Sequence, residues 1–188
     1  IKIEKKDDSS PVTKADLISN EIINESLEKL TPDIPIVSEE NSNVSFKKRK
    51  SWNRYWLIDP LDGTKEFIKK NGEFTVNIAL IVCNEAQIGL INAPVMKNIY
   101  WGHKKHGAHM HNQNGIITQL KVSETIGNTR RIAISRSHKS DDLEKYLRNI
   151  KEYKEIGIGS SLKFCLVANG DADYYPRLGP TSEWDTAA

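Results

Sequence analysis

The sequence predicts a layered α+β fold, with helices packed on mixed sheets in one compact unit or in two lobes of it. Stretches with the apolar spacing of helices are interspersed with stretches typical of strands, and no repeat or Gly, Ser or Pro-rich linker divides the chain. The 188 residues fall within the usual range for one domain. The apolar share of 38% excludes a disordered chain. No apolar run approaches the roughly 18 residues that a membrane-spanning helix needs.

The first third of the chain contains one long helix and two strands in the prediction. Thr13, followed three positions later by Asp16, predicts a capped amphipathic helix that ends at Thr31-Pro32. A short strand over residues 34–37 and a polar, basic surface loop over 41–53 follow. A buried strand over 55–58 comes next and ends at Asp59.

The rest of the chain reads as an antiparallel sheet followed by alternating strands and helices. The predicted elements are strands at 75–83, 87–92 and 98–102, a hairpin at Asn114-Gly115, a strand at 131–135, a polar helix at 141–149, an apolar helix from Gly159-Ser160-Ser161 to 168, and a strand at 174–175. Residues 184–188 are typical of the opening of a helix, so the chain is expected to be a fragment cut at both ends.

The charge balance and the two cysteines narrow the class of protein. With 27 basic and 25 acidic residues, the net charge of +2 disfavours a nucleic-acid binder that works by bulk charge. Cys83 and Cys165 stand in apolar surroundings without a CxxC spacing. Both are predicted to be buried, reduced thiols of a cytosolic protein.

The densest chemical signal is the run Asp-Pro-Leu-Asp-Gly-Thr over residues 59–64, directly after the buried strand. Asp59 and Asp62 stand three positions apart around a proline that fixes the backbone, and like charges so close repel unless a cation holds them. A solvated surface turn is the alternative, but it does not explain the preceding apolar strand. With oxygen ligands only, the pattern favours Mg²⁺ over Zn²⁺.

Three further acidic sites stand at the ends of predicted elements. Asp16 opens the first helix, Glu39 and Glu40 follow the first strand, and Asp185 lies near the end of the chain. Singly, each has an ordinary structural interpretation, since Asp185 suits a helix N-cap and paired glutamates are usually solvated.

Four segments in order match a known signature. They are Pro11-Val12-Thr13-Lys14-Ala15-Asp16, Ser38-Glu39-Glu40, Asp59-Pro60-Leu61-Asp62-Gly63-Thr64 and Trp184-Asp185-Thr186-Ala187-Ala188. Together they resemble the Mg²⁺-dependent, Li⁺-sensitive phosphatase superfamily that includes inositol monophosphatase. Residues 65–67, 72–77, 135–138 and 159–165 further resemble the bacterial CysQ-type 3'(2'),5'-bisphosphate nucleotidases. The resemblance spans nearly the whole chain and implies an α/β/α/β/α sandwich, with 1–188 as a single phosphatase domain that lacks both family ends.

The resemblance also implies a two-metal site. One Mg²⁺ would be held by Glu39, Asp59 and the Leu61 carbonyl, and a second by Asp59, Asp62 and Asp185, so that Asp59 bridges them. Two such ions suit in-line phosphoryl transfer, because one activates water and the other stabilises the leaving oxygen. Thr64 and Asp16 would orient the attacking water, and Glu39 would assist as base.

Substrate contacts follow from the same resemblance. Around the scissile phosphate they are Glu39, Leu61, Asp62, Gly63, Thr64 and Asp185, and on the nucleotide side they are His138, Ser160, Lys163 and Arg177. Lys163 and Arg177 would supply the cations that a 5'-phosphate requires, near a helix start that favours an anion. A plain N-cap and a solvated lysine are the alternatives for Ser160 and Lys163.

One histidine cluster matches no family motif. It consists of His103, His106, His109 and His111, of which the last two would share a strand face. The neighbouring polar hairpin indicates an exposed surface, so no metal role is assigned to it.

The prediction is therefore hydrolysis of the 3'-phosphate of adenosine 3',5'-bisphosphate (PAP), with the sulfate donor PAPS as a second substrate. An inositol monophosphatase or sugar bisphosphatase is the alternative enzyme, disfavoured by Lys65, Glu66, Lys163 and Arg177. A non-catalytic nucleotide-binding fragment is the alternative of another class. A cytoplasmic location is expected, with peripheral association with the inner membrane and the oligomeric state left open.

Overall fold

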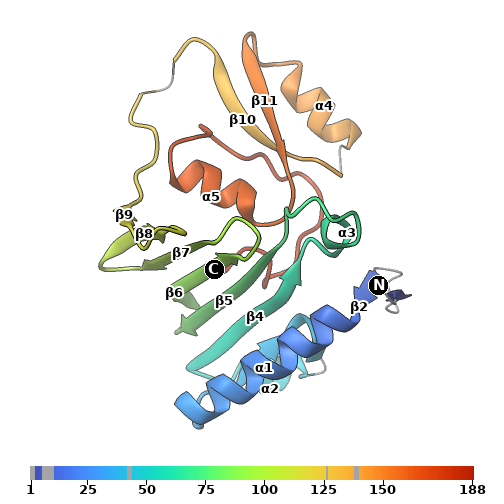
Figure 1. The fold of residues 1–188 in the computed structure, drawn as a ribbon, viewed down its shortest axis with the longest axis vertical. Coiled ribbons are helices and arrows are strands. Elements are labelled where there is room, and N and C mark those ends of the chain that lie inside the picture. Colours follow the sequence, from blue (N-terminus) through green and yellow to red (C-terminus); the bar gives the residue numbers. More distant parts are fainter. Residues whose placement is uncertain (1–2, 6–10, 42–43, 126, 138–139) are drawn as a thin grey trace.

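A seven-stranded mixed sheet forms the main layer of the computed structural model, which describes residues 3–5, 11–41, 44–125, 127–137 and 140–188 (Figure 1). Its strands, in spatial order, are β3 (Ile36–Ser38), β4 (Arg54–Asp62), β5 (Thr75–Val82), β6 (Glu85–Ala93), β7 (Asn98–His103), β8 (Gly107–His111) and β9 (Ile117–Gln119). β3 pairs with β4 in parallel, and the other neighbours are antiparallel. The predicted antiparallel region and the hairpin at Asn114-Gly115 are confirmed.

The long helix α1 (Lys14–Leu30) covers one side of this sheet next to β4 (Figure 1). The side chain of Asp16 accepts hydrogen bonds from the Thr13 backbone N–H and hydroxyl, while Thr13 Oγ1 accepts from the Ala15 N–H, which confirms the predicted cap. Thr13 also ends β2 (Pro11–Thr13), which pairs with β1 (Ile3–Lys5) and was not predicted.

Two predictions around β4 need correction. The stretch 41–53, predicted as a loop, contains the short helix α2 (Phe46–Arg49), which Ser45 caps by accepting a hydrogen bond from the Lys48 N–H. The short helix η1 (Glu39–Asn41) directly precedes most of this stretch and was not predicted. Asp59 does not end its strand either, since β4 continues to Asp62. Pro60 has no N–H to give, so the pairing with β5 breaks after Asp59 and resumes at Asp62 as a bulge.

A second layer lies beyond the sheet and contains β10 (Arg130–Ser135), β11 (Tyr153–Ile158) and α4 (Asp141–Leu147), with α5 (Leu162–Ala168) between the two layers (Figure 1). β10 and β11 pair in parallel. The core of this layer consists of Ile132, Ile134, Leu143 and Leu147. β11 was not predicted. The predicted strand at 174–175 is wrong: Tyr174 makes only an isolated bridge to Ile132, and Pro176 follows it.

The two cysteines differ in their surroundings. Cys165 is buried in α5, and burial raises the pKa of its thiol to about 12. Cys83, predicted to be buried, is exposed, because Cys83 and Asn84 both adopt positive φ in the tight turn between β5 and β6. None of the described helices is long and apolar enough to cross a bilayer.

Candidate active site

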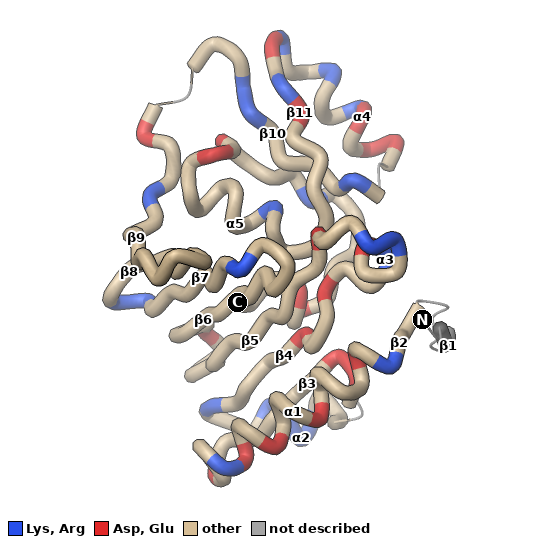
Figure 2. Tube along the Cα trace, in the orientation of Figure 1, with Lys and Arg blue, Asp and Glu red and all other residues tan. Residues whose placement is uncertain are grey.

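The bulge of β4 brings carboxylates to one end of the sheet. Asp59 is 1% exposed and lies opposite Asn77 of β5, and its Oδ1 accepts a hydrogen bond from the Leu61 N–H at 3.0 Å. Asp62 lies opposite Thr75 on the same strand pair. Figure 2 shows acidic positions gathered at this end of β4, near α3 (Thr64–Ile68).

Four carboxylates influence one another here. Burial, and then the negative charges of Asp62, Glu39 and Asp185, raise the pKa of Asp59 well above its ordinary value, and a hydrogen bond with Glu39 adds to the rise. These residues come from β4, from η1 and from the turn at 184–186, where the predicted helix opening is absent. Three predicted metal-binding segments therefore meet at one point.

The second aspartate is held by α5. Ser161 Oγ donates to Asp62 Oδ2 at 2.7 Å and accepts from Asn77 Nδ2 at 2.8 Å. Burial raises the pKa of Asp62, and the Ser161 hydrogen bond partly offsets the rise. Beside it, the buried atoms Thr75 Oγ1 and Asn77 Oδ1 have no hydrogen-bond partner among the residues that the structure describes. Oxygen atoms left without partners next to crowded carboxylates suit a hard cation.

The donor set fits Mg²⁺, because all of its members are carboxylate, carbonyl or hydroxyl oxygens. In the present arrangement of side chains, however, the described part of the chain has no group of three or more acidic, histidine or cysteine side chains close enough together to hold a metal ion. Asp185 Oδ2 instead accepts hydrogen bonds from Thr181 Oγ1 at 3.0 Å and the Ser182 N–H at 2.9 Å. The ligand set predicted from the sequence stays a prediction.

Thr64 and Asp16 meet across 48 positions of sequence, as predicted. Thr64 Oγ1 donates to Asp16 Oδ1 at 3.1 Å, and Leu61 O lies 3.4 Å from the same hydroxyl. Asp16 is 2% exposed. Because the single hydroxyl proton is directed to Asp16, the lone pairs of Thr64 Oγ1 can accept a proton donor from the cavity.

A cavity of about 320 Å³ opens over these groups. The predicted residues that line it are Glu39, Asp62, Gly63, Thr64, Ser160, Lys163, Arg177 and Asp185. Asp16, Asp59 and Leu61 are buried and do not line it. His138 lies outside the described residues. Most of the predicted site therefore surrounds one cavity.

The far wall of this cavity carries the two predicted cations. Lys163 is 6% exposed, its Nζ donates to Ser160 O, and it lies 5.4 Å from the centroid of the Tyr175 ring. Burial lowers the pKa of Lys163, and the charge of Asp62 opposes that effect. Arg177 is exposed and donates to Pro180 O at 2.6 Å. A buried lysine contradicts the solvated alternative.

The sequence did not predict a site role for three residues that support it, namely Ser161, Asn77 and Tyr175. Ser161 stood beside the assigned Ser160 in the same motif, so its hydroxyl was a visible signal. The roles of Asn77 and Tyr175 depend on contacts with distant segments, which no local pattern reveals.

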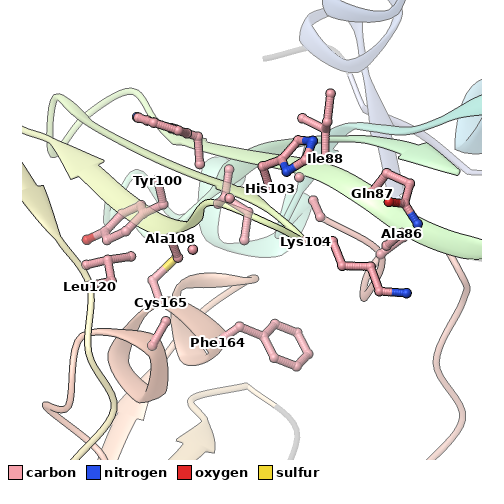
Figure 3. Close-up of a pocket in the computed structure, with 18 residues that line it drawn as sticks. Ala86, Gln87, Ile88, Tyr100, His103, Lys104, Ala108, Leu120, Phe164 and Cys165 are labelled. Carbon is pink, nitrogen blue, oxygen red and sulfur yellow. The ribbon is translucent and has the colours of Figure 1, made fainter.

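A second cavity of about 380 Å³ lies between α5 and the strands β6, β7 and β8 (Figure 3). Figure 3 shows Phe164 and Cys165 on the α5 side, with Tyr100 and His103 on the sheet side. It is similar in size to the first cavity, and its lining includes none of the predicted catalytic residues. Size alone therefore does not identify the site.

The histidine cluster lies on this sheet as well. His109 stacks on Trp101 with ring centroids 4.4 Å apart, and His103 and His106 are 4.6 Å apart. These contacts explain the positions of three of the four rings by packing.

Comparisons with known proteins agree with the predicted resemblance. A family model described as the inositol monophosphatase family matches residues 1–188. The 3'(2'),5'-bisphosphate nucleotidase CysQ of Salmonella typhimurium is 50% identical over 184 residues, which are 98% of this chain and 73% of that protein. CysQ of Escherichia coli K12 is 49% identical over 183 residues, covering 97% of this chain and 72% of that protein.

Solved structures show the same fold. CysQ from Bacteroides thetaiotaomicron, described as a bacterial member of this family, superimposes with a TM-score of 0.77 and 38% identity over 88% of this chain and 68% of that one. An inositol monophosphatase/NADP phosphatase complexed with Mg²⁺ and phosphate matches with a TM-score of 0.81 and 22% identity, over 100% of this chain and 69% of that one. The predicted fold class is confirmed.

Proposed function

The chain belongs to the inositol monophosphatase family, and from this premise we propose that it hydrolyses the 3'-phosphate of PAP to give AMP and phosphate. The relatives that are 49–50% identical carry the name 3'(2'),5'-bisphosphate nucleotidase, which supports this substrate class. PAPS, which has the same 3'-phosphate, is the second proposed substrate. Such an activity belongs to sulfur metabolism and nucleotide recycling.

One observation carries the choice of a bisphosphate. Lys163 and Arg177 line the same cavity as Asp62, Thr64 and Asp185. Burying an ammonium group costs free energy, so a buried lysine indicates that an anion or another polar partner compensates it. A substrate with one phosphate at the carboxylates and another at the cations uses both walls of the cavity.

In the proposed mechanism, separate residues bind the metal ions, orient the attacking water and accept its proton. Glu39, Asp59, Asp62, Asp185 and the Leu61 carbonyl would hold two Mg²⁺ ions, which supply Lewis-acid polarisation of the phosphate and lower the pKa of water. Thr64 accepts a hydrogen bond from the attacking water while Asp16 fixes its hydroxyl. Glu39 takes up the proton of that water.

The 5'-side residues bind and orient the substrate. Lys163 and Arg177 grip the phosphate that is not cleaved, which brings the 3'-phosphate to the carboxylates. Gly63, which lines the cavity, packs closely against the turn at 159–161, because a Cβ at this position would lie 3.1 Å from Ser160 Cβ, and its φ of +92° favours glycine.

The test is a ratio of specificities. We expect Lys163→Ala to lose about 10- to 150-fold in kcat/KM on PAP, the loss of a charge-assisted contact of roughly 1.5–3 kcal/mol, and to keep its activity on inositol 1-phosphate. Lys145→Ala is the matched control, because Lys145 is 71% exposed on α4. Equal losses on both substrates, or a wild type that prefers inositol 1-phosphate, would refute the nucleotidase assignment.

A further inference from the structure

The turn at residues 159–161 is strained and leads into the nucleotide side of the cavity. Ser160 has φ +48°, a left-handed conformation that residues with a side chain adopt only when their surroundings impose it. The same turn precedes Lys163 and contains Ser161, which donates to Asp62. The conformation of this turn therefore sets the position of Lys163 on the nucleotide side and of the hydroxyl that holds Asp62 on the carboxylate side.

Glu73, in the loop between α3 and β5, contacts this turn from outside the cavity. Its Oε2 accepts a hydrogen bond from the Gly159 N–H at 2.9 Å. The same carboxylate forms a two-pronged pair with Arg136, whose Nε and Nη2 donate to it at 2.8 Å each. Arg136 Nη2 also donates to Gly157 O at 2.6 Å. Glu73 and Arg136 together thus hold both ends of the segment that precedes Ser160.

The backbone of Glu73 is equally close to the turn. A Cβ at Gly159 would lie 2.7 Å from Glu73 O, and a Cβ at Gly63 would lie 3.2 Å from the same atom. Both glycines line the cavity, whereas Glu73 and Arg136 do not. The Glu73 carbonyl is therefore packed between the phosphate-facing turn and the nucleotide-facing turn.

We infer that Glu73, paired with Arg136, is a positioning residue that sets the nucleotide-facing turn through the Gly159 N–H and thereby orients Ser160 and Lys163 for the second phosphate. This role rests on the proposed function for its substrate. A charged pair suits it, because a bidentate carboxylate–guanidinium contact fixes direction as well as distance. The Glu73 side chain is 14% exposed and its bond from the Gly159 N–H is partly buried, whereas the Arg136 side chain is 51% exposed, so the bond to Gly159 is the better shielded of the two contacts.

The first readout is independent of activity. Amide hydrogen exchange, followed by mass spectrometry on peptides that cover residues 157–163, should be at least about tenfold faster in Glu73→Ala than in wild type, because the Gly159 N–H loses its charged acceptor. Glu73→Gln keeps one acceptor oxygen and should restore much of the protection. Glu85→Ala is the matched control, since Glu85 pairs with Lys104 on the surface and does not line the cavity. Exchange in Glu73→Ala that equals the control, or that rises throughout the chain, overturns the role.

The second readout separates binding from chemistry. KM for PAP should rise about tenfold in Glu73→Ala while kcat stays within about twofold of wild type, because the groups around the scissile phosphate stand on η1, β4, α3 and the turn at 184–186, outside the turn at 159–161. Glu73→Gln should lie between the two. An unchanged KM despite faster exchange overturns the positioning role. A wild type without activity on PAP overturns the proposed function instead, and the exchange experiment still decides whether Glu73 orders the turn.

Discussion

Replacing Thr64 with valine isolates one hydroxyl in the proposed mechanism. Valine has nearly the shape of threonine, and Asp16 keeps its hydrogen bonds from Thr13 N at 2.9 Å and from Thr13 Oγ1. The start of α1 should therefore stay capped. The variant loses the bond from Thr64 Oγ1 to Asp16 at 3.1 Å and the longer contact of the same hydroxyl with Leu61 O at 3.4 Å.

The expected effects on catalysis and stability differ greatly in size. Without a hydroxyl to orient the attacking water, kcat should fall by about 100-fold, the lower end of the range for a lost acid–base or orienting group. One partly buried hydrogen bond contributes about 0.5–1.5 kcal/mol. At about 2–4 °C per kcal/mol for a chain of this size, the melting temperature should fall by no more than about 6 °C.

Phosphate release from PAP at saturating substrate, with the melting temperature measured in parallel, tests this reasoning. Thr64→Ser restores the hydroxyl and should recover most of kcat. Ser19→Ala is the matched control, because it removes a hydrogen bond from α1 to Pro60 O without altering the cavity wall. If Thr64→Val keeps a wild-type kcat, another group orients the water and the role given to Asp16 is wrong.

Three further predictions concern the buried charges and the thiols. Asp59→Asn should abolish phosphate release yet raise the melting temperature in EDTA, because it removes a buried charge that faces three other carboxylates; a lower melting temperature would contradict this. Hydrogen bonds from Arg131 lower the pKa of Asp173 in the folded chain, so this pair stabilises the fold above the ordinary pKa of 3.8 and loses its effect as the pH falls through the lower, folded value. The gap in melting temperature between wild type and Asp173→Asn should therefore be full at pH 7 and close below pH 3.8, and a gap independent of pH would disprove it. A chromogenic disulfide reagent at pH 8 should label Cys83 in the native protein and spare Cys165, whose pKa is about 12; labelling of both thiols in a chain that circular dichroism shows to be folded would contradict the described burial.

Local signals were enough to predict the elements whose ends are set by neighbouring residues. The cap formed by Thr13 and Asp16 predicted the start of α1, and the strand-like run over 75–83, followed by a short turn, predicted β5. The errors arose where distant partners decide the outcome. β11 has an exposed first half and owes its form to the parallel pairing with β10, and Tyr174 finds only one bridge before Pro176.

The candidate site shows the same division. Two aspartates around a proline in the run 59–64 were enough to predict a metal site there. The resemblance to a known family added Asp185 and Lys163 to the predicted site. No spacing along the chain could show that Ser161 would hold Asp62 across 99 positions, or that Glu73 would hold Gly159 across 86. These contacts depend on how α5 lies against the sheet, which is a property of the packed layers.

Two buried acidic side chains at the candidate site differ in how their negative charge is compensated. Burial pushes the pKa of Glu66 upward, but hydrogen bonds from Ser137 and Asn71 outweigh it and bring the pKa below its ordinary value. Asp59 is as well buried, yet its neighbours are carboxylates and its pKa is raised well above the ordinary value. A satisfied carboxylate such as Glu66 stabilises the fold as it stands, whereas Asp59 destabilises it until a cation binds. Replacing Glu66 with glutamine should therefore lower the melting temperature under the same conditions in which Asp59→Asn raises it.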